Sequence, residues 1–222
     1  MPAAGWKHTV LLRSDGRASA FGNNDGGQCD IPELPDGLSY TQAAGGDEHT
    51  VLLRSDGQAV ACGRDYLLVW SIPSPGDGRR FVHVAAGDYH TVLVRSDGRA
   101  VACGANDYGQ CDLPEAEEGV SYLQVAAGTE HTVLLRSDGR AVACGGNDHG
   151  QCEIPEPGEG LRYLQVAAGS EHTLLLRSDG RVIGCGSDRF GQSDIPEPGP
   201  LGYSQVAAGA YHTVLLRSDG HV

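Results

Sequence analysis

Residues 128–139 read Gly-Thr-Glu-His-Thr-Val-Leu-Leu-Arg-Ser-Asp-Gly, and this stretch decides the fold. A β-prone run from His131 to Arg136 is followed by Ser137-Asp138-Gly139 and then by a second β-prone run, residues 140–144. An Asp-Gly step between two such runs is a strong hairpin signal, because glycine supplies the positive φ that a tight turn requires. The stretch therefore predicts two antiparallel strands joined by a short turn.

The same hairpin recurs along the whole chain. Its first histidine stands at intervals of 41, 41, 41, 41 and 40 residues, at His8, His49, His90, His131, His172 and His212. The text between these anchors recurs as well, since residues 104–114 return with few changes as residues 145–155. Repetition at a fixed period indicates one repeat architecture. We expect a single repeat domain over residues 1–222, made of five full units and the opening part of a sixth.

The repeat unit predicts a propeller blade. Val133, Leu134 and Leu135 are consecutive apolar residues, so both faces of this strand should be buried. Stacked repeats bury both faces of every sheet, and a period of about 40 residues without a helical pattern is typical of a β-propeller, and less so of a β-solenoid. We predict an all-β propeller with the small residues Ala126-Ala127-Gly128 where the blades converge.

The pattern G-x-x-H-T-V-L-L-R-S-D-G, followed by A-x-G and N-x-x-G-Q, resembles the regulator of chromosome condensation repeat over the whole chain. That family includes a chromatin-bound exchange factor, a plant UV-B photoreceptor, domains of HECT-type ubiquitin ligases and a bacterial inhibitor of β-lactamases. The resemblance implies a propeller that typically closes with seven blades. It is specific for fold and uninformative about function, because common folds carry unrelated sites.

The number of repeats is too small for a seven-bladed ring. Either the ring closes with fewer blades, or it is open, or the sequence is a piece of a longer array. We expect six blade positions with the sixth incomplete. An open ring leaves unpaired apolar blade faces, which favours self-association.

The composition excludes several classes of partner. The chain has 29 acidic and 16 basic residues, for a formal net charge of −13, whereas nucleic-acid binding needs clustered cations. Lys7 is the only lysine, so no polybasic membrane patch exists, and no run approaches the roughly 20 apolar residues that span a bilayer. The first residues lack the pattern of a signal peptide, and we expect a cytoplasmic protein without nucleic-acid or membrane partners.

No residue set predicts catalysis, a metal or a cofactor. The six repeated histidines occur once per blade, too far apart to share one ion, and we interpret them as holding the loops that precede them. Six copies of Ser-Asp-Gly are explained by turn geometry rather than by a hydrolase triad. The cysteines fall in two phases of the repeat, where other units have Phe21, Trp70 or Ser193, which indicates packing sites with reduced thiols: Cys29, Cys62, Cys103, Cys111, Cys144, Cys152 and Cys185. We therefore predict that the protein is not an enzyme.

The residues that vary inside the repeat are the candidates for a binding site. Two residues change just before each His-Thr, and all six pairs should emerge at one end of the propeller: Trp6 and Lys7, Asp47 and Glu48, Asp88 and Tyr89, Thr129 and Glu130, Ser170 and Glu171, and Ala210 and Tyr211. They predict a mostly acidic face with three aromatic residues, and such residues are good anchors in protein interfaces.

The second unit departs from the repeat at residues 66–70. Its sequence Tyr-Leu-Leu-Val-Trp replaces Asn-Asp-x-Gly-Gln-Cys. Large apolar residues in a loop indicate either local repacking or a contact patch, here formed by Leu67, Leu68, Val69 and Trp70.

The function that these patterns favour is a non-catalytic protein–protein interaction module or scaffold. It would bind a protein partner through the variable loops on one face of the propeller. The resemblance keeps two alternatives open, an enzyme-inhibitor propeller and an exchange factor for a small GTPase. The lack of a signal peptide counts against the first, because that inhibitor is secreted, and the acidic composition counts against the chromatin binding linked with the second.

Overall fold

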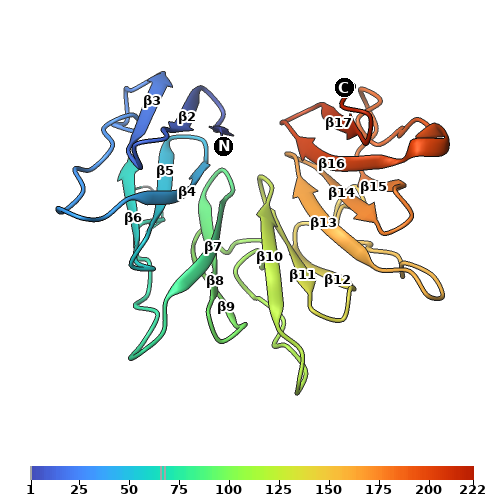
Figure 1. Ribbon diagram of the computed structural model, residues 1–222, viewed down its shortest axis with the longest axis horizontal. Helices are drawn as coiled ribbons and strands as arrows, with labels where there is room; N and C mark the ends of the chain where they lie inside the picture. The colour runs from blue at the N-terminus through green and yellow to red at the C-terminus, as the bar shows by residue number, and fades with distance from the viewer. Residues whose placement is uncertain (1, 66, 68) are drawn as a thin grey trace.

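A computed structural model describes residues 2–65, 67 and 69–222 of the chain. These residues form six antiparallel sheets, or blades, that follow one another around a common centre (Figure 1). Blade 1 contains β1 (Pro2–Ala4), β2 (His8–Leu12) and β3 (Ala18–Gly22); blade 2 contains β4 (Tyr40–Gly45), β5 (His49–Arg54) and β6 (Ala59–Gly63); blade 3 contains β7 (Phe81–Ala86), β8 (His90–Arg95) and β9 (Ala100–Gly104). The all-β propeller predicted from the repeat is confirmed.

The second half of the chain continues the same pattern up to the last blade. Blade 4 contains β10 (Tyr122–Ala127), β11 (His131–Arg136) and β12 (Ala141–Gly145); blade 5 contains β13 (Tyr163–Ala168), β14 (His172–Arg177) and β15 (Val182–Gly186); blade 6 contains only β16 (Tyr203–Ala208) and β17 (Thr213–Arg217), preceded by the short 3₁₀ turn η2 (Gly199–Leu201). Within the described part of the chain, no helix is long and apolar enough to cross a membrane.

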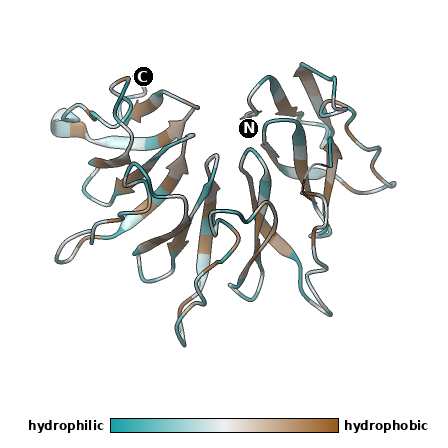
Figure 2. Ribbon diagram, turned by 180° about the vertical axis from the view of Figure 1, so that it is seen from behind, coloured by the Kyte–Doolittle hydropathy of each residue, from teal (hydrophilic) through white to brown (hydrophobic). Residues whose placement is uncertain are grey.

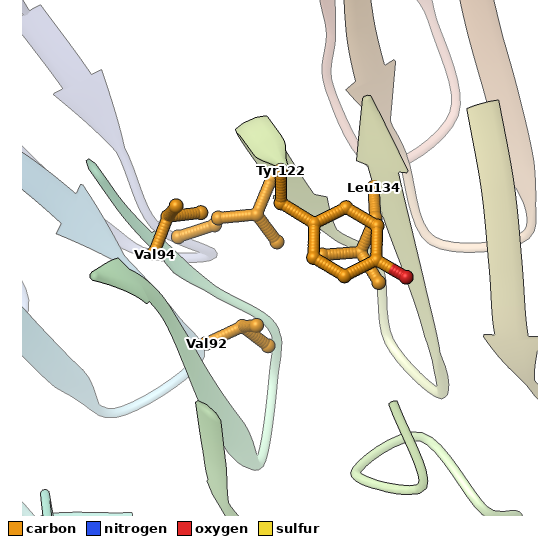
Figure 3. Packing of buried hydrophobic residues seen from close by; sticks show 6 residues of the cluster. Val92, Val94, Tyr122 and Leu134 are labelled. Atoms are coloured by element: carbon orange, nitrogen blue, oxygen red, sulfur yellow. The ribbon is translucent and has the colours of Figure 1, made fainter. Parts of the chain in front are cut away.

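Each hydrophobic core lies between two neighbouring blades. Leu134 of β11 is fully buried and packs against Val92 and Val94 of β8 and against Tyr122 of β10 (Figure 3). Four more clusters of this kind join the other consecutive blades, from blades 1 and 2 to blades 5 and 6. Hydrophobic residues accordingly lie mainly on the strands and hydrophilic residues on the loops (Figure 2). The consecutive apolar residues of the middle strand are buried on both faces, as expected from the sequence.

Polar side chains tie each blade to the next one. In β11, Nε2 of His131 shares a 2.9 Å hydrogen bond with Oγ1 of Thr173 in blade 5. We call the interface between two consecutive blades a joint. The side-chain amide of Gln124 spans the same joint between blades 4 and 5, because its Nε2 donates to the carbonyl of Val166 at 3.2 Å and its Oε1 accepts from the N–H of Val166 at 3.0 Å. The other His–Thr contacts join His8 to Thr50, His49 to Thr91, His90 to Thr132 and His172 to Thr213, at 2.8–3.3 Å.

The loop that leaves one blade is fastened to the following blade. Oγ1 of Thr132 donates to the carbonyl of Gln110 at 2.8 Å, and the hydroxyl of Tyr122 donates to the carbonyl of Pro114 at 2.7 Å. At the far end of each blade the turn Asp bonds the Arg that ends the middle strand, as in Arg136 Nη2 to Asp138 Oδ2 at 2.7 Å. These contacts make every joint depend on two consecutive repeats.

The ring is open between its first and last blades. None of the five hydrophobic clusters joins blade 1 to blade 6 in the described residues, and both termini lie beside the opening in Figure 1. The exposure of equivalent residues shows the same gap, because Thr9 and His212 are exposed whereas their counterparts Thr132 and His131 are buried. Six blade positions with an incomplete sixth, as predicted, are confirmed.

Candidate functional site: the acidic mouth of the propeller

The six variable pairs occupy equivalent tight loops at one end of the blades. Each loop runs from a Gly through the pair to the His that follows, and the Gly N–H donates to the His carbonyl at 2.9 Å in all six copies, as in Gly128 and His131. The histidine therefore closes its loop through its backbone, while its ring reaches the next blade. We call the surface formed by these six pairs the mouth.

The first residues of the pairs surround the central cavity. Their backbones link neighbouring loops, since the N–H of Thr129 donates to the carbonyl of Ser170 at 3.3 Å and the N–H of Ser170 to the carbonyl of Ala210 at 3.1 Å. The cavity has a volume of about 690 Å³ and is otherwise lined mainly by alanine, glycine and valine, together with Tyr211 and His212. In five of the six variable pairs the first residue lines this cavity: Trp6, Asp88, Thr129, Ser170 and Ala210. Small residues converge at the centre, as expected.

Carboxylates dominate the electrostatics of the mouth. Burial raises the pKa of Asp88, and the nearby Asp47 raises it further. Burial also raises the pKa of Glu130, with further contributions from Asp148, Asp88 and Glu171. Like charges that are close together disfavour ionisation and attract cations. The mouth is therefore a region of negative potential.

Few basic side chains lie beside these carboxylates in the described residues. Arg64 Nη1 lies 2.8 Å from Oε2 of Glu48, and His149 Nε2 lies 3.3 Å from Oε2 of Glu171. Lys7 is exposed. The carboxylates of the mouth are thus close neighbours, and only some of them have a basic partner in the described residues.

Aromatic side chains flank the carboxylates at two places. The hydroxyl of Tyr89 donates to Oδ2 of Asp47 at 3.2 Å, and burial together with this carboxylate raises the pKa of Tyr89. At the opening of the ring, Tyr211 packs edge-on against Trp6, with ring centroids 6.0 Å apart, and against Phe190, with centroids 5.5 Å apart. Trp6 and Tyr211 come from opposite ends of the chain, so this cluster bridges the gap between blades 1 and 6.

A second variable position of the repeat also belongs to the mouth, and the sequence analysis missed it. The residue before Gly-Gln changes from repeat to repeat. It is Gly26 in the first repeat, and in three later repeats its side chain reaches the next loop: Tyr108 bonds Glu130, His149 pairs with Glu171, and Phe190 packs on Tyr211. Its variability directly before the repeated Gly-Gln was the signal that could have identified it.

The divergent loop of the second unit is only partly a surface. Val69 is 1% exposed, and its carbonyl accepts hydrogen bonds from Oγ1 of Thr91 and Sγ of Cys103, so it takes the place that Gln110 has in another repeat. The expectation that Val69 contributes to a contact patch is therefore wrong, because its side chain is packed inside the blade. Leu67 and Trp70 are exposed. Leu68 lies outside the described residues.

The histidines and serines that invited a catalytic interpretation lie apart. His131 begins β11 and Ser137 follows its end, and six residues of strand span roughly 20 Å. Burial lowers the pKa of His49, His131 and His172 to about 4 and that of His90 to about 3, so these rings are neutral at pH 7. No three His, Cys, Asp or Glu side chains gather as metal ligands among the residues that the structure describes.

The seven cysteines are free thiols in the structure. Cys62, Cys103 and Cys144 of the third strands face the loop from the preceding repeat, and Sγ of Cys144 lies 3.8 Å from the carbonyl of Gln110. Burial raises the pKa of Cys62, Cys103 and Cys144 to about 12. A thiol with so high a pKa is a poor nucleophile and metal ligand at neutral pH.

Comparisons with solved structures agree with this architecture. Prp20p of Saccharomyces cerevisiae superposes with a TM-score of 0.82 at 20% identity, over 98% of this chain and 69% of that one. The ectodomain of the Physcomitrella patens receptor kinase CR4 superposes with a TM-score of 0.79 at 19% identity, over 100% of this chain and 62% of that one. Human WBSCR16 superposes with a TM-score of 0.80 at 16% identity, over 98% of this chain and 73% of that one. The chain thus spans about two thirds of the length of these structures. Among curated protein sequences, none matches it.

The family model for the regulator of chromosome condensation (RCC1) repeat matches four segments, residues 3–28, 81–110, 123–151 and 164–192. Together they cover just over half of the chain, and each begins in the first strand of a blade and ends at the Gly-Gln loop. The chain therefore belongs to the RCC1 repeat family.

Proposed function

We propose that the protein is a non-catalytic interaction module whose mouth binds a basic segment of a partner protein. The observation that carries this proposal is the nearness of five carboxylates to one another at one end of the blades, beside Tyr89 and the Trp6–Tyr211–Phe190 cluster. The carboxylates belong to Asp47, Glu48, Asp88, Glu130 and Glu171, and the net charge of −13 adds a long-range field of the same sign. Arginine and lysine are the side chains that such a surface attracts, and a tyrosine face also accepts a cation.

The rigidity of the scaffold supports a binding role. Each mouth loop is closed by its own Gly–His hydrogen bond and is linked to its neighbours, so its side chains are held in place before a ligand arrives. Preorganised side chains lose little entropy on binding, which favours affinity. Yeast Prp20 has been crystallised with Kap60 bound to it, and its binding to Gsp1p and histones has been studied, so a propeller of this fold is used to bind proteins.

The test uses a short fluorescein-labelled peptide of alternating arginine and serine, and its affinity is measured by fluorescence polarisation. We expect Glu130→Gln with Glu171→Gln to weaken binding by about tenfold or more, because two carboxylates at the mouth are neutralised. The matched control is Glu118→Gln with Glu159→Gln, which makes the same change in net charge on exposed loops at the other end of the blades. Equal loss in both double variants would show that only the net charge attracts the peptide, and the proposal would fall.

Tyr89 provides a second arm of the test. Tyr89→Phe removes the hydroxyl that bonds Asp47 and keeps the ring, whereas Tyr89→Ala removes both. If the ring anchors the peptide, only the alanine variant loses affinity, and thermal unfolding shows whether either variant has lost its fold.

A further inference from the structure

Three consecutive blades carry an exposed apolar residue at the same position of their first strands. Val82 of β7, Leu123 of β10 and Leu164 of β13 are 42%, 56% and 52% exposed, and each follows the buried aromatic residue that begins its strand. In the described strands of blades 2–5, no other large apolar side chain is exposed. The three residues therefore form a feature of blades 3–5, in the middle of the described chain.

A β-bulge occurs at each of these residues. The register between the first and middle strands of blade 4 shifts between Tyr122 and Gln124, so Leu123 is the extra residue. The same shift occurs at Val82 and at Leu164. A bulge leaves one residue outside the regular pairing and redirects its side chain. Leu123 accordingly belongs to neither of the hydrophobic clusters that flank blade 4.

The three bulge residues come from strands that are direct neighbours. β7, β10 and β13 follow one another around the centre in Figure 1, and β10 lies against both of the others. The side chain of Gln124, the residue after Leu123, is long enough to reach the backbone of Val166 in β13. Equivalent residues of neighbouring first strands are thus separated by little more than the reach of one side chain. We call Val82, Leu123 and Leu164 the apolar row.

The blades on either side of the row have a hydroxyl at this position. In blade 2, Oγ1 of Thr41 donates to the carbonyl of Leu53 at 3.1 Å, and in blade 6, Oγ of Ser204 donates to the carbonyl of Leu216 at 3.2 Å. Such a hydroxyl is satisfied by its own blade and can face water. An exposed leucine, in contrast, contributes to stability or affinity only when another surface covers it.

Two arginines stand beside the apolar row without an acidic partner. Arg80 and Arg162 precede Val82 and Leu164 by two positions, and both are exposed. Their backbone N–H groups bond serine hydroxyls of the same blade, whereas their guanidinium groups make no ion pair or hydrogen bond among the described residues. Both guanidinium groups are therefore available to carboxylates of a ligand.

The electrostatics of this end of the blades differ from those of the mouth. All but three of the 16 basic residues lie in or beside the hairpin turns and the loops that lead into the first strands; the exceptions are Lys7, Arg64 and Arg189. The turn carboxylates are paired with the arginine that ends the middle strand, as Asp138 is with Arg136. Most of the net charge of −13 therefore lies toward the mouth, and an acidic ligand is repelled less from the apolar row.

The apolar row and its arginines define the chemistry of an occupant. The occupant has to offer apolar side chains to the row and carboxylates to Arg80 and Arg162 at the same time. A β-strand with alternating residues turns its polar side chains away from its apolar ones, whereas an amphipathic helix carries polar residues along both borders of its apolar stripe. A helix with acidic borders meets both requirements.

We propose that the apolar row binds an acidic amphipathic helix of a partner protein. The apolar stripe of the helix covers Val82, Leu123 and Leu164, and carboxylates at its border pair with Arg80 and Arg162. The row lies at the start of the first strands, whereas the mouth loops follow their ends. The proposal is therefore independent of the basic ligand of the mouth.

The probe is a fluorescein-labelled peptide of about 18 residues, long enough to form a helix in solution, with leucine on one face, glutamate along both borders of that face and alanine elsewhere. We expect saturable binding by fluorescence polarisation. Leu123→Thr with Leu164→Thr should weaken binding at least about tenfold, because the apolar contact is lost. Arg80→Ser with Arg162→Ser should weaken it as well and reduce its dependence on salt.

The repeat itself uses these replacements, since blade 2 has Thr41 at the first position and blade 4 has Ser121 at the second. Both double variants should therefore keep the fold, which thermal unfolding verifies. Leu11→Thr is the matched control, because Leu11 is a strand leucine of blade 1 that is 40% exposed and lies outside the row. The control variant should bind the peptide like the unmodified protein.

A scrambled peptide of the same composition, with its leucines spread around the helix, should bind at least about tenfold more weakly. Absence of saturable binding, equal binding of the two peptides, or unchanged affinity in both double variants would each overturn the proposal. Sedimentation of the protein alone is the remaining arm. Association that disappears in the Leu123→Thr and Leu164→Thr variant would mean that a second copy covers the row, and the assignment to a partner helix would be wrong.

Discussion

At the scale of single residues, the positions that recur in every repeat make contacts both within their own blade and with the next blade. His131 closes its own loop with its carbonyl and reaches Thr173 of the next blade with its ring, and Gly139 both forms the hairpin turn and accepts a 2.7 Å hydrogen bond from the N–H of Tyr163. A residue used in both local and inter-blade contacts has few acceptable replacements. This explains why six copies of the stretch remain nearly identical while the adjacent pairs differ.

Gly139 allows a direct test of this double role. It has a φ of 83°, and a Cβ at this position would lie 2.3 Å from Cβ of Arg162 in the loop before β13. Gly139→Val should therefore lower the free energy of unfolding by more than about 1 kcal/mol, through backbone strain and the clash together. Urea denaturation measures the loss.

Gly119 serves as the matched control for this substitution. It has a similar φ of 80°, but a Cβ there would meet nothing within 4 Å. Gly119→Val should show the strain without the clash and lose less stability. If the two variants lose equally, the contact between the turn and Arg162 contributes nothing.

At the scale of elements, the middle strand of each blade contributes to the joints on both of its sides. Leu134 of β11 packs toward blade 3, whereas Val133 and Leu135 pack toward blade 5. In β17 the side chains that would face a following blade are partly exposed. The same strand sequence therefore contributes more to the free energy of unfolding in a complete blade than in an incomplete one.

Leu134→Ala and Leu215→Ala measure that difference at equivalent positions. Leu134 is fully buried, so its truncation should lower the free energy of unfolding by about 2–5 kcal/mol. Leu215 is only partly buried, and its truncation should have less than half of that effect. Equal losses would show that blade 6 is packed as tightly as blade 4, contrary to the open ring described above.

The sequence was sufficient to predict the strands of each blade, but it was insufficient to predict the contact between the first and last blades. The 41-residue period, the Asp-Gly turns and the double-sided apolar strands predicted the blades, because every element depends on local pattern and on its identical neighbours. The contact between Trp6 and Tyr211 joins residues about 200 positions apart and depends on the curvature of the ring, which no local pattern encodes. Val69 was misjudged for a related reason, since its burial is set by Thr91 and Cys103 of the following repeat.

At the scale of the whole molecule, the buried histidines make stability depend on pH. The pKa of His49, His131 and His172 is lowered to about 4 and that of His90 to about 3, with burial as the first cause, against about 6.5 in the unfolded chain. Between pH 6.5 and pH 4 these histidines bind more protons in the unfolded state than in the folded state. Their contribution to the free energy of unfolding is therefore complete above pH 6.5 and is lost as the pH falls toward 4.

Urea unfolding between pH 7.5 and 4.5 should show this loss. Each of these histidines contributes up to about 1.4 kcal/mol per pH unit in the window, so the total amounts to several kcal/mol. Asp88 and Glu130, whose pKa is raised by burial, act in the opposite direction and reduce the slope. His90→Asn should flatten the dependence, and a stability that stays constant down to pH 4.5 would contradict the neutral, buried state of these rings.

Hydrophobic clusters join five pairs of consecutive blades, and no described strand covers the outer edge of β17 in blade 6. Hydrogen–deuterium exchange at residue resolution tests this arrangement most directly, by comparing the amides of Thr213 and Leu215 in β17 with those of Thr132 and Leu134 in β11. Because the first pair faces a free edge and the second pair is covered by β12, we expect Thr213 and Leu215 to exchange at least about tenfold faster. Equal protection of the two pairs in the monomer would contradict the open sixth blade.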